Sequence, residues 1–234
     1  MKPLTTVPFI EVIPMNNYRV VEKFVSINGE GQFAGILSIF LRFAFCNLRC
    51  DYCDTMYANQ ESAIYEILSE EEIIAYVKEQ GIKHITLTGG EPLIQENIHS
   101  LIQHLLSEGF IVEIETNGSI LIEPFTKPLR PIFTLDYKLP ASHMESHMKL
   151  ENYNYITKDD IIKFVISDTK DLKKAHTIIE QFNLSHKTNV YFSSVFTKID
   201  PSEIVTYMIE HNLNAIRLQL QLHKFIWSPE QRGV

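Results

Sequence analysis

Short runs of apolar, β-branched and aromatic residues recur along the chain, each about as long as a strand and bounded by polar turn residues. These runs predict strands at residues 20–27, 38–44, 84–88, 111–116, 132–136, 162–166, 190–195 and 215–220. Apolar residues spaced three and four apart predict helices between several of them, at residues 73–78, 93–107, 169–182 and 201–210.

Two of the predicted helices also carry start signals. Ser69 and Glu72 have the spacing of a capping box, and Pro201 stands at a first-turn position. Strands that alternate with helices predict right-handed βαβ units, and therefore an α/β fold with a mostly parallel sheet. Ligands of such sheets bind beyond the carboxyl ends of the strands.

Composition indicates an ordinary soluble globular chain. Its 234 residues are 45% hydrophobic, and no repeat or Gly/Ser linker divides them, which predicts one domain over residues 1–234 with an N-terminal extension at 1–19. No apolar run reaches the roughly 18 residues that span a bilayer. The start, MKPLTTVPFIEVIP, holds an early proline and an acid where a signal peptide would be apolar, so we expect a cytoplasmic protein.

The net charge of -8 argues against a broad nucleic-acid surface, because such surfaces need clustered Lys and Arg. A small-molecule substrate is therefore expected, with neither a nucleic acid nor a membrane as partner.

All three cysteines of the chain, Cys46, Cys50 and Cys53, lie within eight positions. An odd number cannot pair completely within the chain, and a polar loop between them does not suit buried inert thiols, so the cluster indicates a metal site. Structural zinc would need a fourth ligand, which one of nine histidines could supply. Three close thiolates suit a [4Fe-4S] cluster better, if one iron stays open to a small molecule.

With Tyr52 just before the last cysteine, this triad resembles that of the radical S-adenosylmethionine (SAM) enzymes, whose cluster cleaves SAM to a 5′-deoxyadenosyl radical. TLTGGEP, residues 86–92, resembles the GGE motif that holds the amino group of the cofactor in that family. Glycine lets a backbone approach a ligand closely, and carbonyl and carboxylate oxygens accept from an ammonium. The resemblance implies an incomplete, TIM-like α/β barrel.

Further motifs narrow the resemblance to the 7-carboxy-7-deazaguanine synthase family: SINGEG at 26–31, Arg42, Asp54 with Thr55, DYKLPAS at 136–142, and the ending LQLQLHKFIWSPEQRGV. It runs from about residue 20 to the C-terminus and leaves residues 145–159 unmatched. It implies a lyase that converts 6-carboxy-5,6,7,8-tetrahydropterin to 7-carboxy-7-deazaguanine with loss of ammonia, in queuosine and 7-deazapurine biosynthesis. It also implies a homodimer and an electron donor such as flavodoxin or ferredoxin.

The resemblance assigns roles residue by residue. Cluster ligands would be Cys46, Cys50 and Cys53, and Thr55 would bind Mg2+. Cofactor contacts would be Tyr52, Asp54, Gly90, Asp136, Tyr137, Lys138, Ser193, Ser194 and Val195. Substrate contacts would be Ile27, Asn28, Gly29, Arg42, Thr88 and His223. No side chain is expected to act as acid or base, because the radical comes from the cofactor.

Two of these segments depart from the usual family pattern. Asn28 stands where the family usually has glutamine, and its amide still offers a donor and an acceptor. Asp136 and Tyr137 stand where many members have Ser-Pro.

Arg42 is unusual even without the family, because an apolar strand seldom keeps an unpaired charge. Its guanidinium suits a substrate carboxylate, and a structural salt bridge is the alternative.

Other patterns are less specific. His143 and His147 have helical spacing, but without a third ligand we expect an exposed polar insertion. Gln219, Gln221 and His223 alternate as on one strand face, which would either line a pocket or meet water. The aromatic residues Phe43, Phe45 and Tyr191 are expected in the core.

Two alternative functions remain on the sequence alone. A glycyl-radical enzyme activase shares the cysteine triad, but it needs a docking surface for a protein chain. An electron-transfer iron-sulfur protein normally uses a fourth cysteine, which this chain lacks.

Overall fold

The computed structural model describes residues 16–234, so most of the predicted N-terminal extension, residues 1–15, lies outside the described part. One nine-stranded sheet organises the described residues, in the order β3-β1-β2-β4-β5-β6-β7-β8-β9. The strands are β1 (Asn17–Ile27), β2 (Leu37–Phe43), β3 (Glu66–Ser69), β4 (His84–Gly89), β5 (Ile111–Thr116), β6 (Ile132–Tyr137), β7 (Ile161–Ile166), β8 (Asn189–Ser194) and β9 (Ile216–Gln219).

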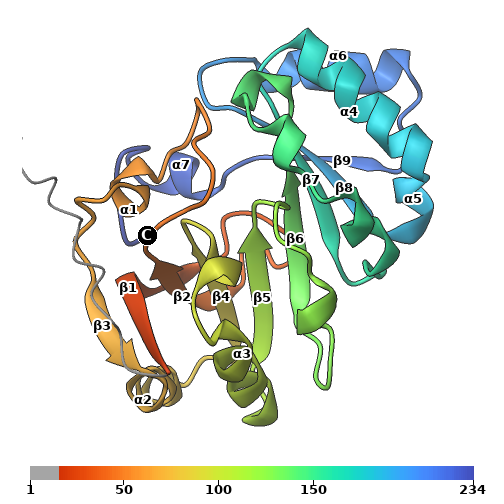
Figure 1. The fold of residues 1–234 in the computed structure, drawn as a ribbon. Helices are drawn as coiled ribbons and strands as arrows, with labels where there is room; N and C mark the ends of the chain where they lie inside the picture. Colours follow the sequence, from red (N-terminus) through yellow and green to blue (C-terminus); the bar gives the residue numbers. More distant parts are fainter. Residues whose placement is uncertain (1–15) are drawn as a thin grey trace, which may run out of the picture.

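From β2 to β9 every neighbouring pair is parallel, whereas β1 is antiparallel to both β2 and β3. The sheet is curved but unclosed, which confirms the predicted partial α/β barrel (Figure 1). All eight predicted strands are present, and β3 is an additional edge strand that no clear hydrophobic period predicted.

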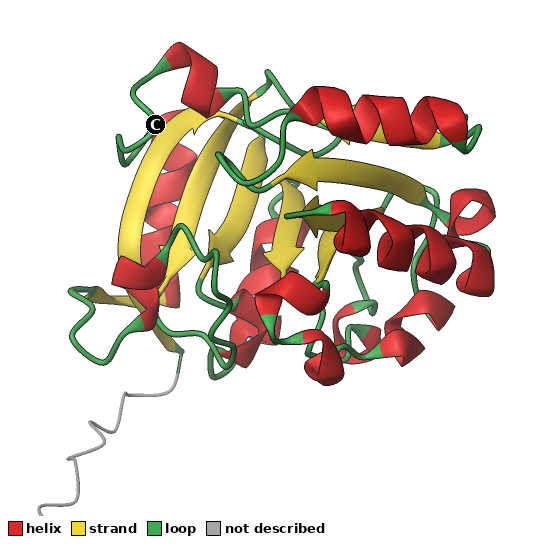
Figure 2. Cartoon of the chain, turned by 90° about the horizontal axis from the view of Figure 1, so that it is seen from above, coloured by secondary structure: helices red, strands yellow, loops and turns green. Residues whose placement is uncertain are grey.

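The helices are α1 (Met56–Asn59), α2 (Glu70–Gln80), α3 (Ile98–Ser107), α4 (Thr169–Phe182), α5 (Leu184–Lys187), α6 (Pro201–Glu210) and α7 (His223–Ile226). The longer ones lie along the outside of the curved sheet (Figure 2). Short 3-10 turns fill the connections at η1 (Pro92–Ile94), η2 (Glu123–Phe125), η3 (Pro140–Ser142), η4 (Glu145–His147) and η5 (Leu150–Asn154). No helix among residues 16–234 is long and apolar enough to cross a membrane.

Local sequence explains where these helices begin. The capping box of Ser69 and Glu72 is formed at α2, and Asp200 caps α6, with Pro201 at its first position. The helix predicted at 93–107 is wrong in its first five positions. Pro92 opens a 3-10 turn, and Asn97 has a left-handed backbone with φ of 57°, so the helix starts only at Ile98.

The core lies between the sheet and its outer helices. Leu101, Ile102 and Leu105 of α3 are fully buried against it, each contributing about 1.5–3 kcal/mol by burial. Phe43 and Tyr191 are buried as predicted, but Phe45 is only half-buried, because it lies where the chain leaves β2 for the cysteine loop. With the outer face packed in this way, the inner face of the sheet is left for polar residues.

Candidate active site

A cavity of about 630 Å³ lies at the carboxyl ends of the parallel strands, on the inner face of the sheet. Several neighbouring strands contribute a polar wall residue: Arg42 (β2), Thr88 (β4), Glu115 (β5), Asp136 (β6), Lys163 (β7) and Ser193 (β8). The strand register aligns two pairs of them, since Arg42 is opposite Thr88 and Asp136 is opposite Lys163. Figure 1 shows α1, α7 and the C-terminus gathered at this end of the sheet.

The cysteine loop between β2 and α1 forms one end of the cavity, and Cys46, Cys50 and Cys53 all line it. Amide groups point at two of the sulfurs. The side-chain nitrogen of Asn117 lies 3.4 Å from Cys46 Sγ, and that of Asn59 lies 3.2 Å from Cys53 Sγ. Such donors favour a charged sulfur, as a metal-bound thiolate is.

The donor set fits a [4Fe-4S] cluster better than zinc. Among residues 16–234, no three His, Cys, Asp or Glu side chains converge closely enough to hold a single ion. Three sulfurs that line one cavity without converging on a single point suit a cluster with one open iron. Burial raises the pKa of Cys46, and it raises that of Cys50 to about 11, so cluster binding must displace protons from these thiols.

Two glycines bring β4 directly beneath this loop. Gly89 has φ of 129°, and Gly90 N–H donates to Phe43 O at 3.0 Å. A Cβ at Gly90 would lie 1.7 Å from Phe45 O, so only glycine permits this contact between the two segments. Gly90 lines the cavity, as a backbone contact to a ligand requires.

Glu91, which follows the glycines, accepts its hydrogen bonds from within the chain. Its carboxylate is fully buried and accepts from Leu93 N, Thr116 Oγ1 and Asn117 N, at 3.0, 2.8 and 2.7 Å. Burial raises the pKa of Glu91 to about 7. Glu91 therefore holds the loop after β5, and with it Asn117, against the cysteine loop.

The predicted cofactor contacts line the cavity beside the cysteines, with one exception. Lys138 Nζ lies 2.7 Å from Asp136 Oδ2. Ser193, Ser194 and Val195 also line this wall, at the end of β8. The same cavity is lined by Asp54, whose side chain is 62% exposed at the rim.

Tyr52 has a hydroxyl that is buried without a hydrogen-bond partner among the described residues. A buried hydroxyl is normally satisfied, so this one suits a polar group of a bound ligand.

Tyr137 is the exception. Its side chain points to the other face of β6, where its hydroxyl donates to Glu145 Oε1 at 2.8 Å and its ring packs 5.4 Å from that of Phe164. Because alternate residues of a strand face opposite ways, Asp136 and Tyr137 cannot both present side chains to the cavity. The side chain of Tyr137 therefore lies outside the cavity, and a cofactor contact by this residue stays a prediction.

Arg42 forms the structural salt bridge considered from the sequence and also lines the cavity. Its Nε donates to Glu22 Oε2 at 2.8 Å, which is the structural salt bridge, and Tyr57 donates to the same oxygen at 3.0 Å. Arg42 still lines the cavity, and within residues 16–234 no hydrogen bond engages its two terminal nitrogens. Glu22 thus holds the guanidinium while one edge stays available to a ligand.

The other predicted substrate residues surround Arg42. Ile27, Asn28 and Gly29 line the cavity, and Thr88 Oγ1 donates to Glu115 Oε2 at 2.7 Å. One N–H of the Asn28 amide donates to the buried Glu113 at 2.9 Å. The second N–H and the oxygen of that amide are left for a ligand, so the expected donor and acceptor role of Asn28 stays a prediction.

His223 packs so closely on Gly29 that a Cβ there would lie 2.4 Å from its Nδ1. The predicted strand alternation ends at Gln219, because the chain then turns into α7. Gln221 and His223 nevertheless line the cavity, so they do not simply face water.

The last six residues, 229–234, also line the cavity, and the Arg232 guanidinium lies 3.7 Å from the ring centre of Tyr57.

Neither His143 nor His147 lies on an α-helix. The side chain of His143 is 70% exposed beside Asp51, as expected of a polar insertion. The segment is not wholly exposed, however, because Asn152 and Tyr153 are buried and anchor it.

Sequence reasoning missed several charged residues of the cavity, among them Glu30, Glu115 and Lys163. A signal for two of them was present. Lys163 in IIKFVI and Glu115 in IVEIET are charges inside apolar strands, the same feature that pointed to Arg42 in SIFLRFA.

Known proteins resemble the chain over most of its length. The radical SAM superfamily model matches residues 41–130. The 7-carboxy-7-deazaguanine synthase of Clostridium acetobutylicum is 55% identical over 220 residues, which cover 93% of this chain and all of the relative. The enzyme of the same name from Koribacter versatilis is 36% identical and covers 92% of this chain and all of the relative.

Solved structures share the fold. QueE from Escherichia coli superposes with a TM-score of 0.70 at 21% identity, covering 88% of this chain and 94% of that one. SuiB from Streptococcus suis, in its structure bound to S-adenosylmethionine, superposes with a TM-score of 0.53 at 12% identity, covering 77% of this chain and 48% of that one.

Proposed function

The chain belongs to the 7-carboxy-7-deazaguanine synthase family of radical SAM enzymes, and from this premise we propose that it converts 6-carboxy-5,6,7,8-tetrahydropterin to 7-carboxy-7-deazaguanine with loss of ammonia. It is a radical SAM lyase of 7-deazapurine biosynthesis. The observation that carries the proposal is one cavity that collects the three cysteines, the glycine turn and Arg42. A curated relative that covers 93% of the chain disfavours an activase, and three cysteines disfavour an electron carrier.

We assign the cluster to Cys46, Cys50 and Cys53, and the bound cluster supplies the electron that cleaves SAM to its 5′-deoxyadenosyl radical. The chain's own contribution is to orient the cofactor and to exclude water. For the cofactor contacts we propose Tyr52, Asp54, Gly90, Asp136, Lys138, Ser193, Ser194 and Val195.

For the substrate we propose Arg42, Thr88, His223 and the segment 27–29, with Arg42 on the substrate carboxylate. Thr55 is proposed as the protein ligand of Mg2+. It lines the cavity next to the cysteines, and magnesium takes its other oxygens from water and substrate.

We further propose that the chain works as a single-domain enzyme in the cytoplasm, as a homodimer, and takes its electron from a flavodoxin or ferredoxin.

Mass spectrometry tests the reaction directly. The chain is reconstituted without oxygen, to about four irons per chain as one cube requires, and is incubated with reductant, SAM and carboxytetrahydropterin. We expect the deazaguanine, and we expect Cys50→Ala to lose SAM cleavage. Cleavage retained by Cys50→Ala, or SAM cleavage without any deazaguanine from the wild type, would refute the proposal.

The Arg42 assignment needs a control for the salt bridge. Arg42→Ala should weaken pterin binding by roughly 1.5–3 kcal/mol, as loss of a charged hydrogen bond does, and should barely change SAM binding. Glu22→Gln removes the charge of the partner but keeps Arg42. If Glu22→Gln weakened pterin binding as much as Arg42→Ala, Arg42 would act only through its salt bridge.

The Mg2+ assignment is tested through turnover. Wild-type turnover should rise with added Mg2+, whereas Thr55→Ala should respond much less. Full wild-type activity under thorough chelation would refute the assignment of Mg2+ and of Thr55 as its ligand.

A further inference from the structure

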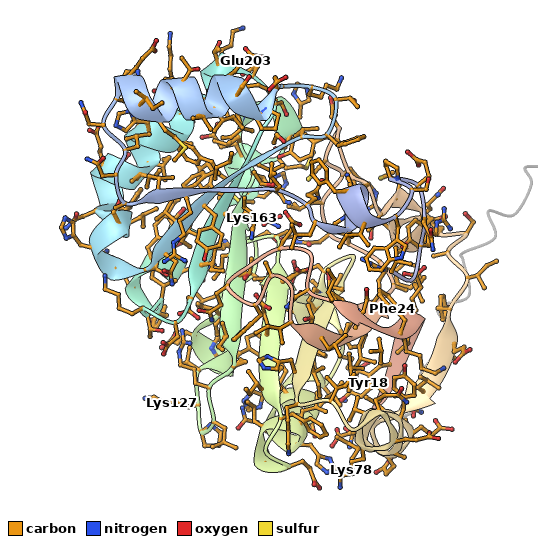
Figure 3. The ribbon with its side chains drawn as sticks, turned by 180° about the vertical axis from the view of Figure 1, so that it is seen from behind. Tyr18, Phe24, Lys78, Lys127, Lys163 and Glu203 are labelled. Atoms are coloured by element: carbon orange, nitrogen blue, oxygen red, sulfur yellow. The ribbon has the colours of Figure 1, made fainter. Side chains whose placement is uncertain are left out.

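Four charged side chains of alternating sign form a row along the cavity wall. Glu30 Oε2 lies 3.4 Å from Lys163 Nζ, Lys163 Nζ lies 3.3 Å from Asp136 Oδ1, and Asp136 Oδ2 lies 2.7 Å from Lys138 Nζ. All four line the same cavity, and Figure 3 shows Lys163 near the centre of the molecule.

The two ends of this row reach different parts of the proposed site. Glu30 directly follows the segment proposed to bind substrate, and it also accepts from Ser193 Oγ at 3.2 Å. Lys138 lies near Tyr52 and Cys50, on the side proposed for the cofactor, close enough for both to favour its charged form. The row therefore spans from one proposed ligand to the other.

Lys163 is shared almost equally between its two carboxylates. Both distances exceed the 2.7–2.9 Å or so of a strong charged hydrogen bond, whereas Lys138 makes one tight contact. Burial alone would lower the pKa of Lys163, but Asp136, Glu30 and Glu115 more than offset it, so Lys163 stays charged. A charged ammonium between two acceptors can approach either one only by leaving the other.

We propose that Lys163 is a positioning residue that couples SAM binding to pterin binding. The inference rests on the proposed function. A cationic group of SAM that binds at Asp136 competes with Lys163, which then moves toward Glu30. Lys163 there offsets the charge of Glu30, which otherwise repels the substrate carboxylate in the same cavity. Cofactor and substrate then bind more tightly together than apart, and by linkage the effect is equal in both directions.

Equilibrium dialysis measures this coupling without turnover. The reconstituted enzyme is kept oxidised, so that SAM is not cleaved, and the Kd of labelled SAM is measured with and without saturating carboxytetrahydropterin. In the wild type the pterin should tighten SAM binding by at least about 5-fold. Lys163→Met should reduce that factor below about 2-fold, whereas Lys163→Arg, which keeps a cation able to reach both carboxylates, should retain most of it.

The exposed Lys173→Met on α4 is the matched control and should keep the wild-type factor. A merely structural role for Lys163 would weaken both ligands alike and leave the factor unchanged. If Lys163→Met does not fold, as judged by circular dichroism, Glu30→Gln and Asp136→Asn each remove the charge of one of its two partners and should each lower the factor.

The outcomes distinguish the proposed function from the proposed coupling by Lys163. A wild type that binds SAM but no pterin refutes the proposed function, and the coupling falls with it. A wild type that binds both without coupling, or a Lys163→Met variant with the wild-type factor, refutes the coupling and leaves the proposed function standing.

Discussion

Glu113 should make the protein less stable as the pH rises through neutrality, and Glu113→Gln should remove that effect. Glu113 lies on β5 and is 2% exposed. Its carboxylate accepts from Asn28 Nδ2 at 2.9 Å and from Thr134 Oγ1 at 2.7 Å. Burial, and then the charge of Glu115, raise the pKa of Glu113 to about 7, because two neutral donors do not replace the lost water.

The direction of this pH effect on stability follows from proton binding. An unfolded glutamate titrates near 4.5, so between about pH 4.5 and 7 the folded protein holds a proton that the unfolded chain has lost. This stabilises the fold below pH 4.5, and the stabilisation is lost as the pH rises through 7. Integration from pH 5 to pH 8 gives a loss of about 2.5 kcal/mol in the free energy of unfolding.

Urea unfolding followed by circular dichroism at pH 5, 6, 7 and 8, on the metal-free reduced chain, measures the effect. Glu91, whose pKa is also raised to about 7, titrates in wild type and variant alike, so its contribution cancels in the difference between them. The exposed Glu210→Gln is the control and should keep the wild-type slope. If the free energy of unfolding changed with pH equally in the wild type and in Glu113→Gln, the reasoning would be refuted.

Three further substitutions test local features of the fold and site. Gly90→Ala should destabilise the protein by at least about 3 kcal/mol, because its Cβ would overlap the carbonyl oxygen of Phe45; an unchanged melting temperature would contradict this. Tyr52→Phe should stabilise the ligand-free protein by about 1 kcal/mol, since it removes an unsatisfied buried hydroxyl, yet weaken SAM binding in dialysis; opposite signs in either assay would count against a ligand role. Ser69→Ala should cost about 1 kcal/mol in urea unfolding, and no loss would mean that the capping box contributes nothing.

The periodic patterns predicted most of the fold. Alternating strand and helix patterns indicated the parallel sheet, and a parallel sheet places the residues after each strand at one edge. For this reason the cysteines after β2, the glycines at the end of β4 and the serines at the end of β8 could be expected in one place. Local chemistry predicted the capping box of α2 equally well, because its partners are three residues apart.

Side-chain pairing was decided only by the tertiary structure. Glu91 is turned away from the cavity by donors on the loop after β5, and the amide of Asn28 is held by Glu113, a residue 85 positions away. Lys163 and Glu30 are 133 positions apart and meet only because the sheet curves.

The sequence by itself determined the chemical groups, the strands that carry them and the edge of the sheet where they gather, because all of these depend on neighbours close along the chain. Only the tertiary structure decided which charges face one another across the cavity. A charge is satisfied by whatever partner the fold brings within a few ångströms, and several of those partners lie twenty or more positions away along the chain, as Glu22 does from Arg42.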